Sequence, residues 1–374
     1  MIHLDSETAE AQLRSGEAWT QFCELLQAAG SVLQRDDLPD DAFTRAEGLR
    51  YLTRLVRAGL EAFVEHADPG APVLARVVHE TAKMGNDNPD NHYLNAALDG
   101  TGTYLLRGRR GTVHWLELAT QRGSYGESRG LPPTGHLDGS ALVLDDDGGF
   151  EVVIAAERPA GAANWLPMTP DTGTLIIRQS RLDPATETLA ELHLERVGGP
   201  GPTPIDPQRA VTGLLRAGML VGGAAQIFAE WQAGFRRDHL NRLPRFDQAL
   251  SDAMGGVPHI TYHHSAWALA PDEALVIDTP LVPCDHWNFQ LSNHWLESLD
   301  YRHDRIHTNS KLARLRPDGT LRLVVAHTDP GVPNWLTTQG HAHGSMCFRW
   351  VHAAEDPPEP ACRVVPVASV ASLP

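Results

Sequence analysis

Apolar residues recur at steps of three and four in the first third of the chain, which is the spacing of an amphipathic helix. They predict one helix that begins at Ser6-Glu7 and ends at Gly30, and a second that begins near Asp40-Asp41. Asp68-Pro69-Gly70 stops the second helix. The apolar face of the first helix consists of Leu13, Trp19, Phe22, Leu25, Leu26 and Ala29.

From about Tyr104 the pattern changes to short alternating runs between Gly, Pro and Asp turns, as in residues 150–154 and 174–178. Such runs are typical of antiparallel sandwiches and barrels. Asp206-Pro207 then has the form of an N-cap and a first-turn proline, and predicts a helix through Phe235. Strands resume near His259 and continue to about Val351, and the tail from Glu355 is either a docked strand or irregular.

The chain contains an internal repeat. Gly149 precedes Asn164-Trp165-Leu166 by 15 residues, and Gly319 precedes Asn334-Trp335-Leu336 by the same 15 residues. Upstream, His114-Trp115 matches His286-Trp287, and downstream each copy has a glycine followed by a strand that ends in arginine, Arg178 and Arg349. Two unrelated hairpins with similar turns are the alternative.

We therefore predict an α+β, mainly β fold of two similar antiparallel β-sandwich-like modules, with N-terminal helices and a bridging helical segment. The predicted regions are an N-terminal helical region (1–70), a first β module (71–200), bridging helices (201–255) and a second β module with the C-terminal tail (256–374). A cleft between two such modules is a favoured place for a ligand.

Composition excludes several classes of partner. Lys and Arg total 31 against 47 Asp and Glu, a net charge of −16, which disfavours nucleic acid and anionic membrane surfaces. The sequence has no run of about 20 apolar residues, the length that a membrane-spanning helix requires. Its N-terminus has no signal-peptide pattern. Four scattered cysteines indicate free thiols. We expect a cytoplasmic protein that binds a small molecule, and its acidic surface and Trp-rich modules are compatible with a homodimer.

Residues 83–93 are dense in short polar side chains. A functional interpretation makes Asp90 and Tyr93 catalytic, Asp90 as a base or acceptor and Tyr93 as a donor. Lys83 is a further donor and, like Asn88, a substrate contact. The structural alternative is an elaborate turn before a strand, since Asn and Asp form Asx turns readily.

The stretch from Trp287 to Asn309 mixes aromatic rings, amides and arginines, a combination suited to an oxygenated organic molecule. Its candidate substrate-binding residues are Trp287, Asn293, Arg302, Arg305 and Asn309. In the alternative interpretation, the arginines only pair with Asp300, Asp304 and Glu297.

The second Asn-Trp corner has the stronger claim to a site, because His341 follows Trp335 closely. His341 is a candidate base. His341 and His343 could also hold a metal with Asp285 or Asp329 as third ligand, but surface or hydrogen-bonded histidines in a His-rich chain are the favoured explanation, because no ligand set is closed by spacing.

On these residues the chain resembles the bacterial family known as "domain of unknown function" 1214, whose relatives often pair with the 1254 domain. The resemblance spans about residues 40–352 and implies two β-rich modules with flanking helices, but no reaction and no catalytic set. It is carried by residues 45–48, 87–90 with Tyr93, 109–112 and 287–309, by the block 329–336, and by Gly340-His341.

Three functions remain open. The first is an enzyme that acts on a small, largely apolar oxygenated molecule, such as a terpenoid, a steroid or an aromatic alcohol or its ester, by acid–base or electrostatic catalysis. The second is a non-catalytic protein that binds a small molecule or carbohydrate. The third is a metal-dependent hydrolase or oxygenase using His341 and His343. We predict no organic cofactor, because no phosphate-binding, dinucleotide or hydrolase motif is present.

Overall fold

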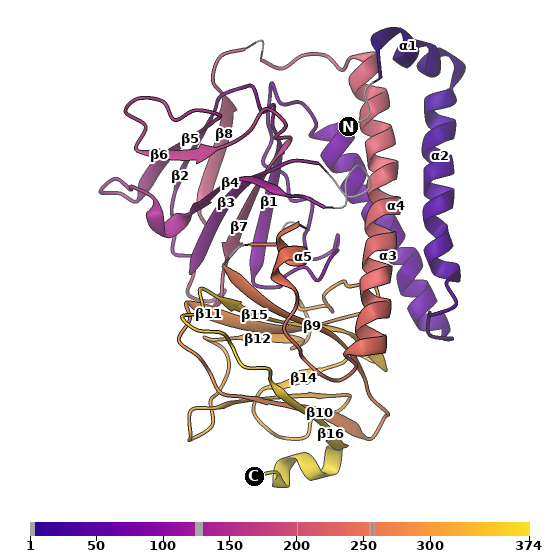
Figure 1. Ribbon diagram of the computed structural model, residues 1–374, viewed down its shortest axis with the longest axis vertical. Helices are drawn as coiled ribbons and strands as arrows, with labels where there is room; N and C mark the ends of the chain where they lie inside the picture. Colours follow the sequence, from indigo (N-terminus) through magenta and orange to yellow (C-terminus); the bar gives the residue numbers. More distant parts are fainter. Residues whose placement is uncertain (1–3, 124–129, 200, 254–255, 258) are drawn as a thin grey trace.

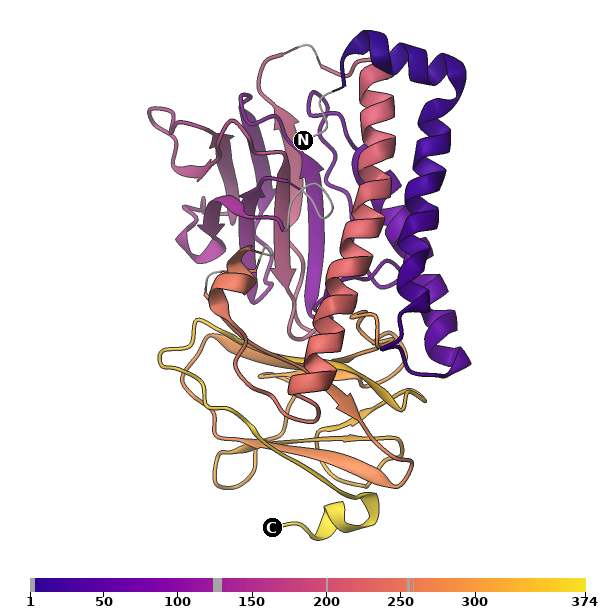
Figure 2. The ribbon, with the colours of Figure 1, turned by 45° about the vertical axis from the view of Figure 1, so that its right-hand side comes forward.

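The computed structural model describes residues 4–123, 130–199, 201–253, 256–257 and 259–374. Two β modules are stacked along the long axis of the molecule, and a layer of long helices covers one side (Figures 1 and 2). The helices are α1 (Ser6–Ser15), α2 (Glu17–Ala29), α3 (Ala42–Leu60), α4 (Pro207–Asp238) and α5 (Gln248–Ala253), with 3-10 turns η1 (Gly30–Gln34), η3 (Gly139–Ala141) and η4 (Val367–Ser372) and a π-helical turn η2 (Glu61–Glu65).

The first module is a sandwich of two four-stranded sheets. Its first sheet has the order β1 (Asn91–Ala97), β7 (Thr174–Ser180), β3 (Trp115–Gln121) and β4 (Pro133–Asp138). Its second sheet has the order β6 (Asn164–Pro167), β5 (Gly149–Ala155), β2 (Tyr104–Arg109) and β8 (Glu191–Arg196). Leu116, Leu118 and Ile177 of the first sheet pack against Val152 and Ile154 of the second.

The second module repeats this topology strand by strand. One sheet has the order β9 (Ile260–Ala268), β15 (His343–Val351), β11 (His286–Ser292) and β12 (His307–Asn309). The other has the order β14 (Trp335–Thr337), β13 (Leu321–Ala326), β10 (Glu273–Thr279) and β16 (Ala361–Pro366). In both modules the short strand that begins at or just after the Asn-Trp corner pairs in parallel, β6 with β5 and β14 with β13, among otherwise antiparallel pairs. The predicted fold of two similar β modules is confirmed, and the tail contributes a strand.

The Asn-Trp corners of the two copies are bonded identically. Asn164 donates to the carbonyls of Val143 and Glu151 and accepts from the Val143 N–H. Asn334 makes the same three bonds, two with the backbone of Arg314 in a loop and one with the carbonyl of Arg322 in β13, at 2.7–2.9 Å. The tryptophan that follows each asparagine donates its indole N–H to a strand carbonyl 3.0 Å away. Each corner therefore fastens a parallel strand to its sheet.

The two corners differ in backbone strain, which gives a matched test. Asn334 has φ 56°, a left-handed conformation that asparagine tolerates and alanine does not, whereas Asn164 has no positive φ. Both alanine variants lose the same hydrogen bonds, so we expect Asn334→Ala to lower the free energy of unfolding by about 1–2 kcal/mol more than Asn164→Ala. Urea denaturation measures this, and Asn334→Gly should recover the difference. Equal losses of unfolding free energy in the two alanine variants would contradict the assignment of the extra loss to the left-handed backbone of Asn334.

The predicted first helix is divided in two. Gly16 adopts φ 79° and separates α1 from α2, so the expectation of one continuous helix was wrong. Its predicted apolar face was also too wide, because Trp19 is 63% exposed. α3 begins as predicted, with Asp41 accepting from the Thr44 N–H.

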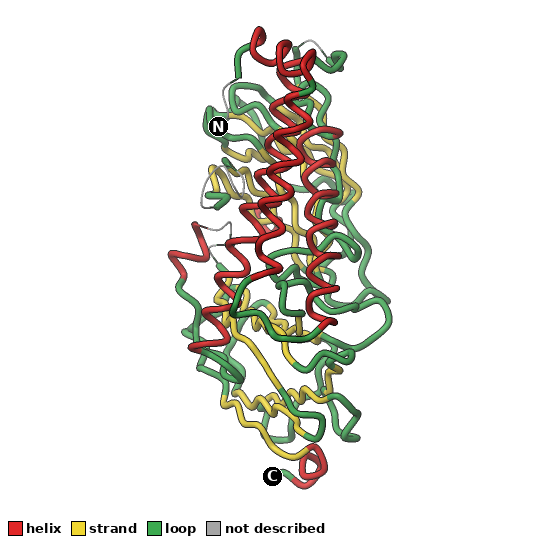
Figure 3. Tube along the Cα trace, turned by 90° about the vertical axis from the view of Figure 1, so that its right-hand side faces the viewer, coloured by secondary structure: helices red, strands yellow, loops and turns green. Residues whose placement is uncertain are grey.

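α4 lies beside both modules, and the long helices run side by side along one face (Figures 1 and 3). It begins as predicted, with Asp206 as N-cap and Pro207 in its first turn. Gly213 lies against η2, where an added Cβ would meet the Phe63 carbonyl oxygen at 2.0 Å, so only glycine permits this approach. Among the described helices α4 alone is long and apolar enough to cross a membrane, and more than half of its most apolar stretch is buried against the rest of the protein.

Candidate functional site

The sheets that face the module junction carry polar side chains on a buried face. Side chains alternate across a strand, so in β11 Phe289 points into the sandwich core while His286 and Asn288 line the junction. The same alternation in β7 and β15 places Arg178 and Arg349 at the junction. A sheet face that is both polar and enclosed is unusual for packing alone, and it marks the junction as a candidate site.

A cavity of about 300 Å³ lies between these faces. Its walls come from β1, β3 and β7 of the first module and β9, β11 and β15 of the second, closed on one side by α4 and η2. π-helical turns occur frequently at functional sites, and Ala62 and Phe63 of η2 line this cavity. The volume is at the lower end of the range for ligand pockets, which suits a small molecule.

Two tyrosine–arginine pairs, one from each copy of the repeat, meet in the cavity wall. Tyr93 lies opposite Arg178 in β1 and β7, and Tyr262 lies opposite Arg349 in β9 and β15. Burial raises the pKa of Tyr93 and raises that of Tyr262 to about 12. Both hydroxyls therefore keep their protons near neutral pH and can donate hydrogen bonds to a bound molecule.

The two arginines differ in how their charge is balanced. Arg178 donates to Glu117 at 2.7 Å, a direct ion pair. Arg349, which is 6% exposed, donates to neutral oxygens only: the Gln290 side chain, the Asn288 side chain and the Asn86 carbonyl. Within the described part of the chain, no carboxylate forms an ion pair with Arg349. The cavity thus contains a buried positive charge without a direct counter-ion.

A row of rings leads from α4 to this charge. Trp231 contacts Phe246 with ring centroids 5.3 Å apart, and Phe246 contacts His264 at 5.0 Å. His264 stacks on Tyr262 at 5.3 Å, and the Arg349 guanidinium lies 5.8 Å from the Tyr262 ring. Burial lowers the pKa of His264 to about 3, so this ring is neutral near pH 7. The wall is therefore apolar along its length and cationic at one end.

The segment 83–90 fastens the first module to the second. The Lys83 ammonium donates to the carbonyls of Ser298 and Leu299, and burial lowers its pKa. The Asp87 carboxylate accepts from the Ser298 N–H and hydroxyl at 2.9 and 2.8 Å. Lys83 makes a structural contact here and lies outside the cavity lining, which corrects its predicted role as a substrate contact.

Asp90 is the centre of this junction. Its carboxylate accepts from the side-chain amides of Asn288 and Asn309, each at 2.9 Å, and lies 3.3 Å from His307. Asp90 and Asn309 thus belong to one cluster, which the sequence left open, and the cluster is structural: both are buried and neither lines the cavity. The prediction of Asp90 as the base that faces substrate is corrected. Of the residues predicted in this segment, Asn88 and Tyr93 line the cavity.

Three candidates from the second module belong to its scaffold. Trp287 packs in the sandwich core, on the opposite face of β11 from the cavity. Asn293 donates to Glu297 at 2.9 Å and is buried. Trp335 is the corner residue described above and packs against the β10–β13 face. Their predicted contact with substrate is not compatible with these positions.

The predicted arginines of the second module lie at the surface. Arg302 is exposed and pairs with Asp300 at 2.6 Å, as in the alternative interpretation of this stretch. Arg305 is also exposed. Neither lines the cavity, so they are corrected as candidate substrate contacts.

His341 and His343 face the helical layer. His341 Nε2 lies 2.9 Å from a Glu47 oxygen and its Nδ1 lies 2.8 Å from the Thr338 carbonyl, while His343 lies 3.3 Å from Asp41. Both ring nitrogens of His341 are thus engaged, which corrects its role as a catalytic base. Among the described residues, these two histidines do not belong to a cluster with the ligand spacing of a metal site.

Sequence reasoning identified Arg178 and Arg349 as matching features of the repeat without giving them a role. The signal that finds them is the alternation of side chains along a strand: each arginine is opposite in phase to the core residues of its strand, Leu175 and Ile177 in β7 and Phe348 and Trp350 in β15. A charged residue on a strand between core positions faces away from its own core. The repeat placed both arginines at the same face of equivalent sheets.

Comparisons with known proteins agree with this architecture. The model of the family described as "Protein of unknown function (DUF1214)" matches residues 94–181, within the first module. The structure of an uncharacterised protein from Burkholderia cenocepacia is similar at 48% identity, with a TM-score of 0.93, covering 96% of this chain and 99% of that one. The VPA0106 protein from Vibrio parahaemolyticus shares the fold at 12% identity, with a TM-score of 0.51 over 91% of this chain and 100% of that one. A search of curated proteins gave no match.

Proposed function

Because the chain belongs to the DUF1214 family, whose description assigns no activity, we propose its function from its own cavity. The protein binds a small amphipathic molecule with an anionic head group, such as a carboxylate, between its two β modules. Arg349 pairs with the head group, and the rings of Trp231 and Phe246 pack against the apolar part.

The observation that carries this proposal is the charge of Arg349. A buried cation loses its hydration, and neutral acceptors compensate only part of that loss. A carboxylate in the cavity would supply the missing opposite charge and accept charge-assisted hydrogen bonds from the guanidinium. The hydroxyls of Tyr93 and Tyr262, two residues that line the same cavity, are additional donors for this head group.

Binding is favoured over turnover by the residues first considered as catalysts. Asp90 accepts hydrogen bonds from two asparagines and lies outside the cavity lining, and His341 has both ring nitrogens engaged. Acid–base chemistry on a bound molecule would require a group that faces the cavity and exchanges a proton readily. Tyr93, the third candidate, does line the cavity, but burial raises the pKa of its hydroxyl, which favours a hydrogen-bond donor over a proton-transfer group near neutral pH. The second of the three functions considered from the sequence, a small-molecule binding protein, is therefore the one we propose.

The test is a comparison of two ligands that differ only in the head group. We expect octanoate to bind more tightly than 1-octanol in calorimetric titrations. We expect Arg349→Met to weaken octanoate binding by about 10- to 100-fold, the worth of hydrogen bonds to a charged group, and to leave 1-octanol binding unchanged.

Two further variants complete this test. Arg349→Lys keeps the charge and should retain part of the preference for octanoate, while Arg302→Met removes an exposed arginine and should have no effect. Trp231→Ala should weaken octanoate binding more than binding of a shorter carboxylate. If 1-octanol binds as tightly as octanoate, or if Arg349→Met binds octanoate normally in a folded protein, the proposal is wrong.

A further inference from the structure

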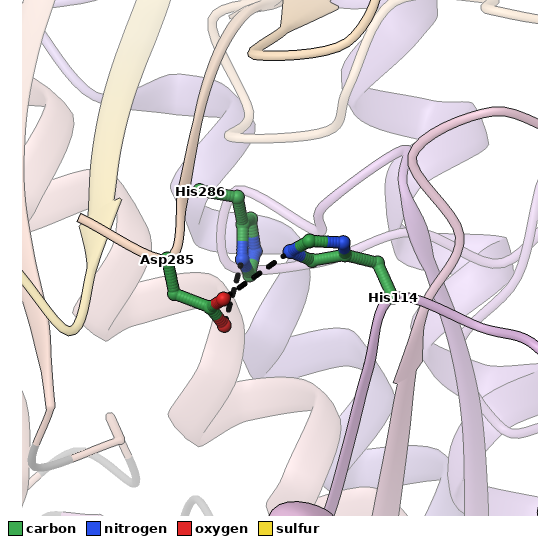
Figure 4. Close-up of side chains that lie close together, drawn as sticks. All are labelled: His114, Asp285 and His286. Atoms are coloured by element: carbon green, nitrogen blue, oxygen red, sulfur yellow. Dashed lines mark ion pairs between the residues drawn. The ribbon is translucent and has the colours of Figure 1, made fainter.

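Two histidines and an aspartate from different modules converge at the edge of the cavity. His114 precedes β3 in the first module, and Asp285 and His286 stand at the start of β11 in the second (Figure 4). One possible ligand atom from each residue lies within 4.8 Å of the others. The two histidines occupy equivalent positions in the repeat, but the first copy has Val113 where the second has Asp285. The pair of copies therefore supplies one carboxylate and two imidazoles.

The distances match those of a shared ion. His114 Nε2 lies 3.4 Å from one Asp285 oxygen, and His286 Nδ1 lies 3.6 Å from the other. Nitrogen and oxygen ligands at about 2.0–2.2 Å from one tetrahedral ion lie roughly 3.3–3.6 Å apart. The rings of the histidines touch edge to face, with centroids 5.0 Å apart.

The nitrogens at this point lack hydrogen bonds. His286 has a side chain that is 2% exposed, and its Nδ1 has no hydrogen-bond partner. His114 Nε2 is also buried without a hydrogen-bond partner. Buried polar atoms in folded proteins are normally satisfied. Two of them aimed at the same carboxylate indicate a site whose ligand completes their bonding.

We propose that His114, Asp285 and His286 bind one divalent first-row transition-metal ion, with Zn²⁺ as the expected occupant. Two imidazoles and one carboxylate are a donor set that such ions accept, with a remaining position for water. Because the ligands come from both modules, the ion would join them. His286 also lines the cavity, so the ion would lie beside the site of the proposed function without depending on it.

Metal titration of the untagged, chelator-treated protein tests this assignment without any organic ligand. We expect Co²⁺ to give ligand-field absorption that saturates at one ion per chain and that Zn²⁺ displaces. Zn²⁺ should also raise the melting temperature, since an ion bound only by the folded state stabilises it.

Variants separate this site from incidental metal binding. Asp285→Asn changes an exposed side chain and is expected to fold normally. Asp285→Asn and His114→Gln, as single variants, should each weaken Co²⁺ binding by at least about 10-fold, since disturbing even an outer-shell group of a metal site has an effect of this size. His193→Gln, at an exposed histidine, is the matched control and should bind Co²⁺ normally. No saturable absorption, or equal affinity in Asp285→Asn, His114→Gln and the control, would overturn the proposal. Neither result would bear on octanoate binding.

Discussion

Asp90→Ala is expected to lower the free energy of unfolding by roughly 3–5 kcal/mol while leaving ligand binding intact. The carboxylate is 3% exposed and joins segment 83–90 of the first module to Asn288, His307 and Asn309 of the second. Hydrogen bonds to a charged group contribute about 1.5–3 kcal/mol each, and their loss also leaves buried amide donors unsatisfied. Urea denaturation measures the change.

The pH dependence of this loss follows from the pKa of Asp90. Burial alone would raise that pKa, but the hydrogen bond and charge of His307 and the hydrogen bonds from Asn288 and Asn309 outweigh burial and hold it below its usual value. A carboxyl with a lowered folded-state pKa contributes stability above its unfolded pKa and loses it as pH falls toward the folded one. The difference between wild type and Asp90→Ala should therefore be constant near neutral pH and shrink below about pH 4.

A control variant separates the effect of removing a negative charge from the effect of removing the buried hydrogen bonds of Asp90. Asp146→Ala removes the same charge from an exposed position and should change stability by less than about 0.5 kcal/mol. If Asp90→Ala keeps wild-type stability but loses octanoate binding, Asp90 acts on the ligand and its structural assignment is wrong.

The features of the fold that could be predicted from the sequence are those that depend on residues close together in the chain. The repeat was detectable because each Asn-Trp corner makes its bonds to backbone groups about ten to twenty residues away, so the same local sequence is needed twice. The start of α4 was likewise predictable, since its N-cap and first-turn proline act on adjacent residues. The break at Gly16 was missed because a single glycine is tolerated within many helices.

The candidate site was harder to predict because its residues are paired over long separations. Asp90 and Asn309 are 219 residues apart, and Glu47 and His341 are 294 apart. A buried aspartate in a polar segment has the same local sequence whether it faces a substrate or two asparagines. Only the partner decides between those roles, and spacing along the chain does not reveal the partner. The alternation of side chains along β15, by contrast, would have placed Arg349 on the outer face of its sheet.

Arg178→Met is expected to destabilise the protein about as much as Asp90→Ala, because it leaves Glu117 buried without its cation. Glu117 is 1% exposed and pairs with Arg178 at 2.7 Å, and within the described part of the chain its other ion-pair neighbour is His136, at 3.4 Å. Removing one partner of a buried ion pair costs about 3–5 kcal/mol, whereas replacing both by apolar residues is often neutral. The double variant Glu117→Met/Arg178→Met should therefore be more stable than Arg178→Met in urea denaturation.

The pH dependence gives a second readout of the same pair. In the wild type, burial tends to raise the pKa of Glu117, but Arg178 and His136 outweigh it and hold that pKa below its usual value. Without Arg178, burial should raise the folded-state pKa above the unfolded one, so the variant is stabilised by protonation and loses stability as pH rises through that raised pKa. The deficit of Arg178→Met relative to wild type should consequently shrink as pH falls from 7 to about 5. A deficit that is independent of pH, with a double variant no more stable than the single one, would mean that Arg178 stabilises the junction by packing rather than by compensating the charge of Glu117.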